Sequence, residues 1–120
     1  MTRKDVFHYV KKTYQIEPDY PFREDFDSAV LRHRDTKKWF ALVMHVGADK
    51  LGHESGEVLD ILTMKSEPML IDSLVLRSSF HRAYHMNKTQ WLSVELNDRI
   101  SAKEIDSLID LSYGLTDKKK

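Results

Sequence analysis

The 120-residue chain contains no cysteine. This absence excludes disulfides, thiolate metal sites, iron–sulfur clusters and cysteine nucleophiles. The sequence also has no apolar run approaching the roughly 18 residues of a membrane-spanning helix. Residues 1–5 include charges but are followed by no apolar segment of the kind that marks a signal peptide. We therefore expect a cytoplasmic protein that has no membrane partner.

The chain has no net charge, because 19 Lys and Arg residues balance 19 Asp and Glu residues. A domain pI above about 9 is the usual footprint of nucleic-acid binding, and the pI here is about 7.0. The charge is nevertheless uneven, since no acidic residue occurs from Arg77 to Val94. Affinity for a polyanion must therefore come from a local surface.

Motifs of the common enzyme classes are missing as well. The sequence has no GxSxG, P-loop or GxGxxG pattern, and its six histidines do not follow HExxH or another metal-binding spacing. His33 and His45 are cross-strand neighbours only if the hairpin register allows it, and His81 and His85 are four residues apart. The acidic residues of segment 24–27 can hold a cation in principle, but exposure alone accounts for a charged loop. We expect no enzyme activity, no cofactor and no metal.

Hydrophobic residues make up 41% of the chain and aromatic residues 10%, which is enough for a single core in a chain of this length. We find no internal repeat and no linker, so residues 1–120 are expected to form one domain.

Three segments have the signals of helices. Thr2 and Asp5 can cap a first helix that ends before Pro18. Ser66 precedes Glu67 and Pro68 at the start of a second helix. Ser101 and Glu104 have the spacing of a capping box, and Gly114 is expected to end the third helix.

Four segments have the alternating or continuous apolar pattern of strands, namely residues 26–34, 39–46, 58–64 and 91–96. Residues 47–56 are expected to form a long mobile loop. Consecutive strands joined by loops pair antiparallel. The expected fold class is therefore α+β, in two layers, with helices packed on one face of an antiparallel sheet, in the order α-β-β-β-α-β-α.

The sequence resembles the MmcQ/YjbR-like family. The resemblance rests on Asp19-Tyr20-Pro21-Phe22, Lys38-Trp39-Phe40-Ala41-Leu42, Glu67-Pro68, Ala83-Tyr84-His85-Met86-Asn87-Lys88 with Trp91 and Val94, and Ile109, Ser112 and Tyr113. It implies a CyaY-like or secretion-chaperone-like fold and a predicted DNA-binding "double wing" protein, and it brings no catalytic residues. Arg23, where the family pattern often has glycine, and the long loop at 47–56 depart from that pattern.

We expect double-stranded DNA to be bound through a modest basic surface in residues 77–103 together with the nearby hairpin tips. The candidate contacts are Arg77, His81, Arg82, His85, Asn87 and Lys88. Cationic and amide side chains at a surface can bind phosphate, and Trp91 can stack on a base. The structural alternative is a turn held by Asn87, with Met86 and Trp91 in the core.

Trp39 and Phe40 are adjacent in one strand and point to opposite faces of the sheet. One of them must lie on the face away from the helices, where it marks a surface for a protein partner or a homodimer unless a loop covers it. A protein-interaction or chaperone-like module is therefore the alternative function.

Overall fold

The computed structural model describes residues 1–22, 28–54, 56–83 and 86–117. The elements in chain order are α1 (Arg3–Tyr14), β1 (Ala29–Arg32), β2 (Trp39–Gly47), the 3-10 helix η1 (Ala48–Leu51), β3 (Val58–Lys65), α2 (Pro68–Leu74), β4 (Phe80–Arg82), β5 (Trp91–Glu95) and α3 (Ala102–Thr116). The expected α+β class and order of elements are confirmed. The short strand β4 is an addition to them.

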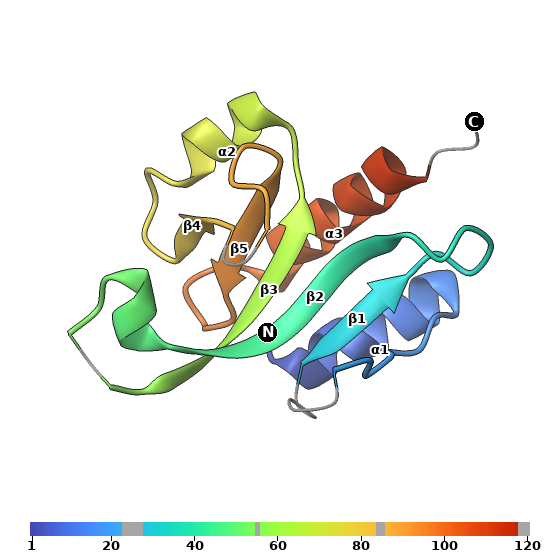
Figure 1. Cartoon of the computed structure of the whole chain (residues 1–120), viewed down its shortest axis with the longest axis horizontal. Coiled ribbons are helices and arrows are strands. Elements are labelled where there is room, and N and C mark those ends of the chain that lie inside the picture. The colour runs from blue at the N-terminus through green and yellow to red at the C-terminus, as the bar shows by residue number, and fades with distance from the viewer. Residues whose placement is uncertain (23–27, 55, 84–85, 118–120) are drawn as a thin grey trace.

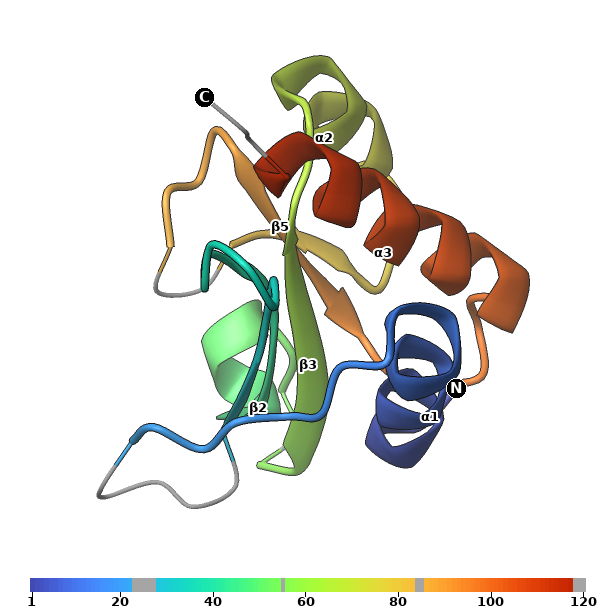
Figure 2. The ribbon, with the colours of Figure 1, turned by 90° about the vertical axis from the view of Figure 1, so that its right-hand side faces the viewer.

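The strands form one antiparallel sheet in the order β1-β2-β3-β5-β4. Helices α1 and α3 lie on one side of this sheet, and α2 lies beyond one of its ends (Figures 1 and 2). The opposite side, called the outer face here, carries no long helix formed by the described residues and is bordered by loops and by η1 (Figure 2).

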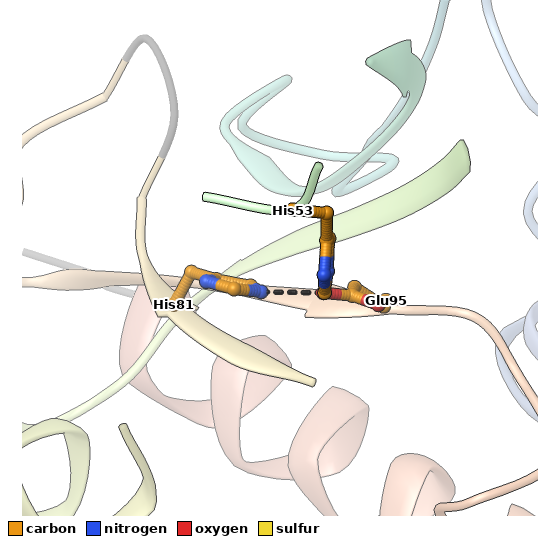
Figure 3. Close-up of side chains that lie close together, drawn as sticks. All are labelled: His53, His81 and Glu95. Carbon is orange, nitrogen blue, oxygen red and sulfur yellow. Dashed lines mark hydrogen bonds and ion pairs between the residues drawn. The ribbon is translucent and has the colours of Figure 1, made fainter. Parts of the chain in front are cut away.

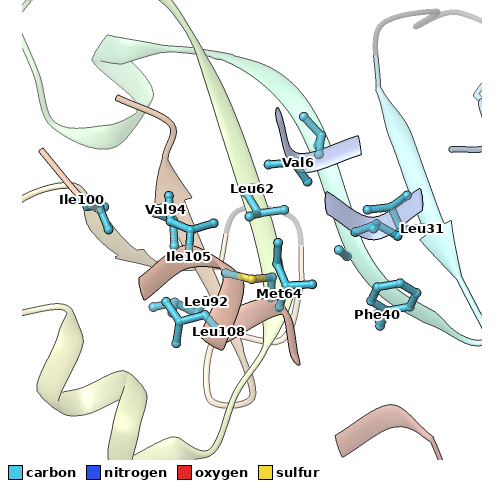
Figure 4. Packing of buried hydrophobic residues seen from close by; sticks show 14 of the residues in the cluster. Val6, Leu31, Phe40, Leu62, Met64, Leu92, Val94, Ile100, Ile105 and Leu108 are labelled. Carbon is cyan, nitrogen blue, oxygen red and sulfur yellow. The ribbon is translucent and has the colours of Figure 1, made fainter. Parts of the chain in front are cut away.

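The main hydrophobic core fills the space between the sheet and the helices. Leu62, Met64 and Leu92 project from the central strands toward Ile105 of α3 (Figure 4). A bulge places Phe40 in this core as well, because Leu31 pairs with Ala41 while Arg32 pairs with Trp39, leaving Phe40 as the extra residue. Because of the bulge, Phe40 and its neighbour Ala41 both lie in the core on the helix side, and Trp39 lies on the outer face.

The helix ends follow the sequence signals in part. Thr2 and Asp5 form the expected capping box of α1. The Ser101 side chain caps α3 by accepting the backbone N–H of Glu104. The Glu104 carboxylate binds Arg77 and does not complete the expected capping box, because a guanidinium is a stronger donor than a backbone amide.

Two other helix boundaries differ from expectation. Helix α2 begins at Pro68, with Glu67 and not Ser66 at the N-cap. Helix α3 continues through Gly114 to Thr116, because the Thr116 hydroxyl donates to the Ser112 carbonyl and also lies 2.7 Å from His33 Nε2. These contacts hold the last turn in place beyond the glycine.

The strand pattern needs three corrections. The first strand is limited to Ala29–Arg32, and residues 26–27 lie outside the described part of the chain. The expected loop at 47–56 contains η1. His33 and His45 are not cross-strand neighbours, because the β1–β2 register pairs Ala29 with Val43 and places His33 beside Lys38, at the other end of β2 from His45.

Within the described ranges, every helix is too short or too polar to cross a lipid bilayer.

Candidate functional site

Two hairpin connections leave the sheet at the same end, which we call the hairpin end. Residues 33–38 join β1 to β2, and residues 83–90 join β4 to β5. The strand register places both connections at this end. Lys65 at the end of β3 pairs with Trp91 at the start of β5, and Met64 pairs with Ala41 near the start of β2. Helix η1 lies at the opposite end (Figure 1).

The arginines of the predicted DNA-binding set are paired with acidic residues. Arg77 donates two hydrogen bonds to Glu104 of α3, at 2.6 and 3.1 Å. This contact lowers the pKa of the Glu104 carboxyl. Arg82 lies 3.0 Å from Asp72 of α2. Each arginine therefore brings a carboxylate to the surface that a DNA phosphate would approach.

The other members of that set occupy different places. His81 projects from the outer face, whereas Arg82, the next residue in the strand, projects toward α2. Lys88 donates to the Ala83 carbonyl at 2.8 Å, and Asn87 Oδ1 accepts from the backbone and the hydroxyl of Thr89. His85 lies outside the described residues. The described members therefore do not form a single patch.

A different group of cations gathers at the hairpin end. Arg34, Lys37, Lys38, Lys65 and Lys88 lie in or beside the two connections, and none forms an ion pair with a described acidic residue; we call them the hairpin-end cations. Arg34, Lys37, Lys38 and Lys88 are exposed, and Lys65 is half-buried. The other described lysines and arginines without an acidic partner are dispersed over α1, η1 and the start of α3, and they are Lys4, Lys12, Lys50, Arg99 and Lys103.

The outer face carries a second apolar cluster. Its fully or nearly buried members are Val30, Leu42, Met44, Val46 and Ile61, and the half-buried residues packed on them are Phe22, Trp39, Leu51, Leu59, Met86 and Trp91. Trp39 lies under the Arg32 guanidinium, which is 5.8 Å from the ring centroid, and Phe22 meets its edge at 6.1 Å. Phe40, the other candidate interface residue, is fully buried on the helix side. Residues outside the strands, namely Phe22, Leu51 and Met86, therefore cover part of the outer face.

One polar cluster lies on the same face. The Nε2 atoms of His53 and His81 are 2.7 and 2.6 Å from Oε2 of Glu95 (Figure 3). Burial raises the pKa of the Glu95 carboxyl, but the hydrogen bonds from the two histidines outweigh burial and leave this pKa below its usual value. A buried carboxylate is thus kept charged by two imidazoles.

Sequence spacing gave no signal for this cluster. The three residues are far apart in the chain and come from three elements, so only the strand register and the position of the loop after η1 bring them together. A hollow of about 400 Å³ adjoins them, and its lining includes Glu54, Glu57 and Asn97.

Taken together, the architecture is that of a small two-layer α+β domain with helices on one face of an antiparallel sheet and two hairpin connections at one end. The YjbR family model matches residues 11–115, and the chain belongs to this family.

Similar proteins support the assignment. An uncharacterized Bacillus subtilis protein, YyaQ, is 39% identical over 116 residues, which are 97% of this chain and 98% of YyaQ. A crystal structure of a Pseudomonas syringae protein is 41% identical, with a TM-score of 0.93 over 97% of this chain and 99% of that one. A crystal structure of a Deinococcus radiodurans protein with a DUF419 domain is 22% identical, with a TM-score of 0.74 over 98% of this chain and 80% of that one. At this identity the likeness supports the fold alone.

Proposed function

We propose that this protein is a non-enzymatic DNA-binding protein that contacts the phosphates of a duplex with its hairpin end. The observation that carries this proposal is the grouping of five cations around two adjacent hairpin connections, none of which pairs with an acidic residue in the described part of the chain. Lys and Arg side chains on projecting loops position a protein on the DNA backbone without reading base sequence.

This surface keeps the hairpin tips that the sequence analysis expected but not most of the expected basic contacts in residues 77–103. Among the expected contacts, Lys88 and Asn87 belong to the hairpin end, whereas Arg77 and Arg82 hold carboxylates. Binding phosphate at either arginine requires breaking an ion pair or bringing two anions together. The connection 33–38 also contains Asp35, but its exposed cations Arg34, Lys37 and Lys38 form no ion pair with a described acidic residue, so phosphate binding there breaks none.

The number of hairpin-end cations sets the expected salt dependence and strength of DNA binding. Each phosphate contact contributes about 0.9 to the slope of log K against log salt concentration. Five contacts predict a slope of about −4.5, well short of the value for a strong, sequence-specific repressor. The proposed binding is therefore weak at physiological salt and insensitive to base sequence.

The test is the fluorescence anisotropy of a labelled DNA duplex across a salt series. The variant R34Q/K37Q/K38Q removes three hairpin-end cations, and its slope should be shallower by about 3. The matched control K4Q/K12Q/K103Q removes three charges from α1 and α3 and should bind like the wild type. Absence of binding at low salt, or equal losses in both variants, would contradict the proposal.

The alternative is a protein-interaction or chaperone-like module using the outer face. One observation favours it, because Trp39 remains half-buried on an apolar cluster against which the described part of the chain packs only the short helix η1 and no long helix. Phe22 and Arg32 already pack on that ring, which leaves less of it for a partner. Sedimentation of the pure protein tests self-association, and a concentration-dependent dimer that W39A abolishes would place this function first.

A further inference from the structure

The histidine–glutamate cluster on the outer face has the composition of a metal site. His53 follows the end of η1, His81 lies in β4, and Glu95 ends β5. One nitrogen of each ring and one carboxylate oxygen lie within 4.8 Å of one another. Figure 3 shows both imidazoles converging on the same carboxylate from different sides.

We propose that His53, His81 and Glu95 bind a divalent transition metal ion, for which zinc is the probe. Two imidazoles and one carboxylate, with a further position open, are a ligand set that zinc adopts in proteins. Imidazole nitrogen favours zinc and its transition-metal neighbours, whereas magnesium and calcium favour sets made only of oxygen. The site is independent of the DNA-binding surface, because it lies away from the hairpin end.

The distances require only a small adjustment. Ligand atoms around a tetrahedral zinc ion with bonds near 2.05 Å are about 3.3 Å apart. The two nitrogen–oxygen distances here are 2.7 and 2.6 Å, so each has to widen by a fraction of an ångström as the ion enters. His53 stands on a loop and its side chain is 41% exposed, which makes this movement feasible.

The chemistry of the metal-free cluster favours an incoming cation. Glu95 is only 5% exposed, and its carboxylate is hydrogen-bonded to both imidazoles. A metal ion replaces these hydrogen bonds with direct bonds and requires each ring to carry its proton on Nδ1. The adjoining hollow, lined by His53, Glu54 and Glu57, gives water or another carboxylate access to the remaining coordination positions.

The direct test is calorimetric titration of the full chain with zinc chloride. We expect one ion per chain, and a loss of affinity of more than about 100-fold in H53A, H81A and E95Q, since removal of even an outer partner of a metal ligand costs 10–100-fold. The control H8A removes an exposed histidine of α1. The control D35N removes a member of the other possible ligand group, which consists of His33, Asp35 and Asp117.

A second measurement on the wild type covers the case in which a variant fails to fold. Long-range proton–nitrogen NMR spectra should show zinc-dependent shifts of Nε2 in His53 and His81 and none in His8 or His45. The proposal fails if zinc does not bind at one ion per chain. It also fails if D35N loses binding, if the three cluster variants retain it, or if the shifts appear at other histidines.

Discussion

The Ser112 hydroxyl of α3 donates a hydrogen bond to the Phe40 carbonyl of β2 at 2.6 Å. The same oxygen accepts the backbone N–H of Lys65 at the end of β3, at 2.9 Å. Ser112 is fully buried, so this one side chain satisfies backbone groups of two neighbouring strands and ties the last helix to the sheet.

Ser112→Ala should lower the free energy of unfolding by about 1–3 kcal/mol. The substitution leaves a backbone carbonyl and a backbone amide buried without their partner, and such groups are costly in a protein interior. Urea unfolding followed by circular dichroism measures the effect. Ser107→Ala, at an exposed position in the same helix, is the matched control and should change stability little; equal stability of the two variants would disprove the role of Ser112.

The hydrogen bonds between two tyrosines of α1 and Asp110 of α3 predict a loss of stability at high pH. Tyr9 Oη lies 2.8 Å from both carboxylate oxygens of Asp110, and Tyr14 Oη lies 2.5 Å from one of them. Burial and the hydrogen bond to Asp110 raise the pKa of Tyr9 to about 12, and the same causes raise the pKa of Tyr14. The folded state therefore keeps these protons at a pH where the unfolded chain releases them.

Because both pKa values are raised on folding, their contribution to stability is complete below pH 10 and is lost as pH rises from 10 through about 12. Unfolding measured at several pH values in that window should show falling stability. Y9F/Y14F should be less stable at neutral pH but show a weaker decline above pH 10. Y20F, which removes an exposed tyrosine hydroxyl, should follow the wild type, and an unchanged slope in Y9F/Y14F would exclude this mechanism.

The ion-paired arginines make a prediction about DNA. R77Q/R82Q removes two positive charges that Glu104 and Asp72 already offset. If the hairpin end is the contact surface, this variant should bind a labelled duplex within about twofold of the wild type, with an unchanged salt slope. A fall in slope of about 2 would return the contact surface to the segment first indicated by the sequence.

The fold was predictable where local signals and packing agree. Thr2 and Asp5 form the capping box that their spacing indicates, and the alternation of residues 29–33 places Leu31 and His33 on the helix side. Strand β4 was missed because three residues between turn-like segments have no periodicity of their own. Its existence depends on pairing with β5, which is a tertiary contact.

The candidate sites were harder to predict for a similar reason. A run of residues without acids predicts a positive surface only if no acid approaches from elsewhere, and Glu104 and Asp72 approach from two helices. The histidine–glutamate cluster is built by the register of β4 and β5 and the path of the loop after η1, and none of these follows from spacing along the chain. Charge in one segment is a property of sequence, whereas a charged surface depends on the fold.

Gly52, the residue before His53, forms the turn that positions this ligand of the proposed metal site. Gly52 has a φ of 91°, a conformation that residues with a Cβ rarely adopt, and its N–H caps η1 by donating to the carbonyls of Ala48 and Asp49. Gly52→Ala should lower the free energy of unfolding by about 1–2 kcal/mol.

Because strain at residue 52 moves the backbone that carries His53, Gly52→Ala should also weaken zinc binding. Gly56→Ala is the matched control, since its φ is not positive and a Cβ there meets nothing within 4 Å. It should leave stability unchanged or raise it by up to about 1 kcal/mol, because alanine restricts the unfolded chain. Parallel urea and zinc titrations measure both effects, and equal behaviour of the two variants would show that the turn at Gly52 does not position His53.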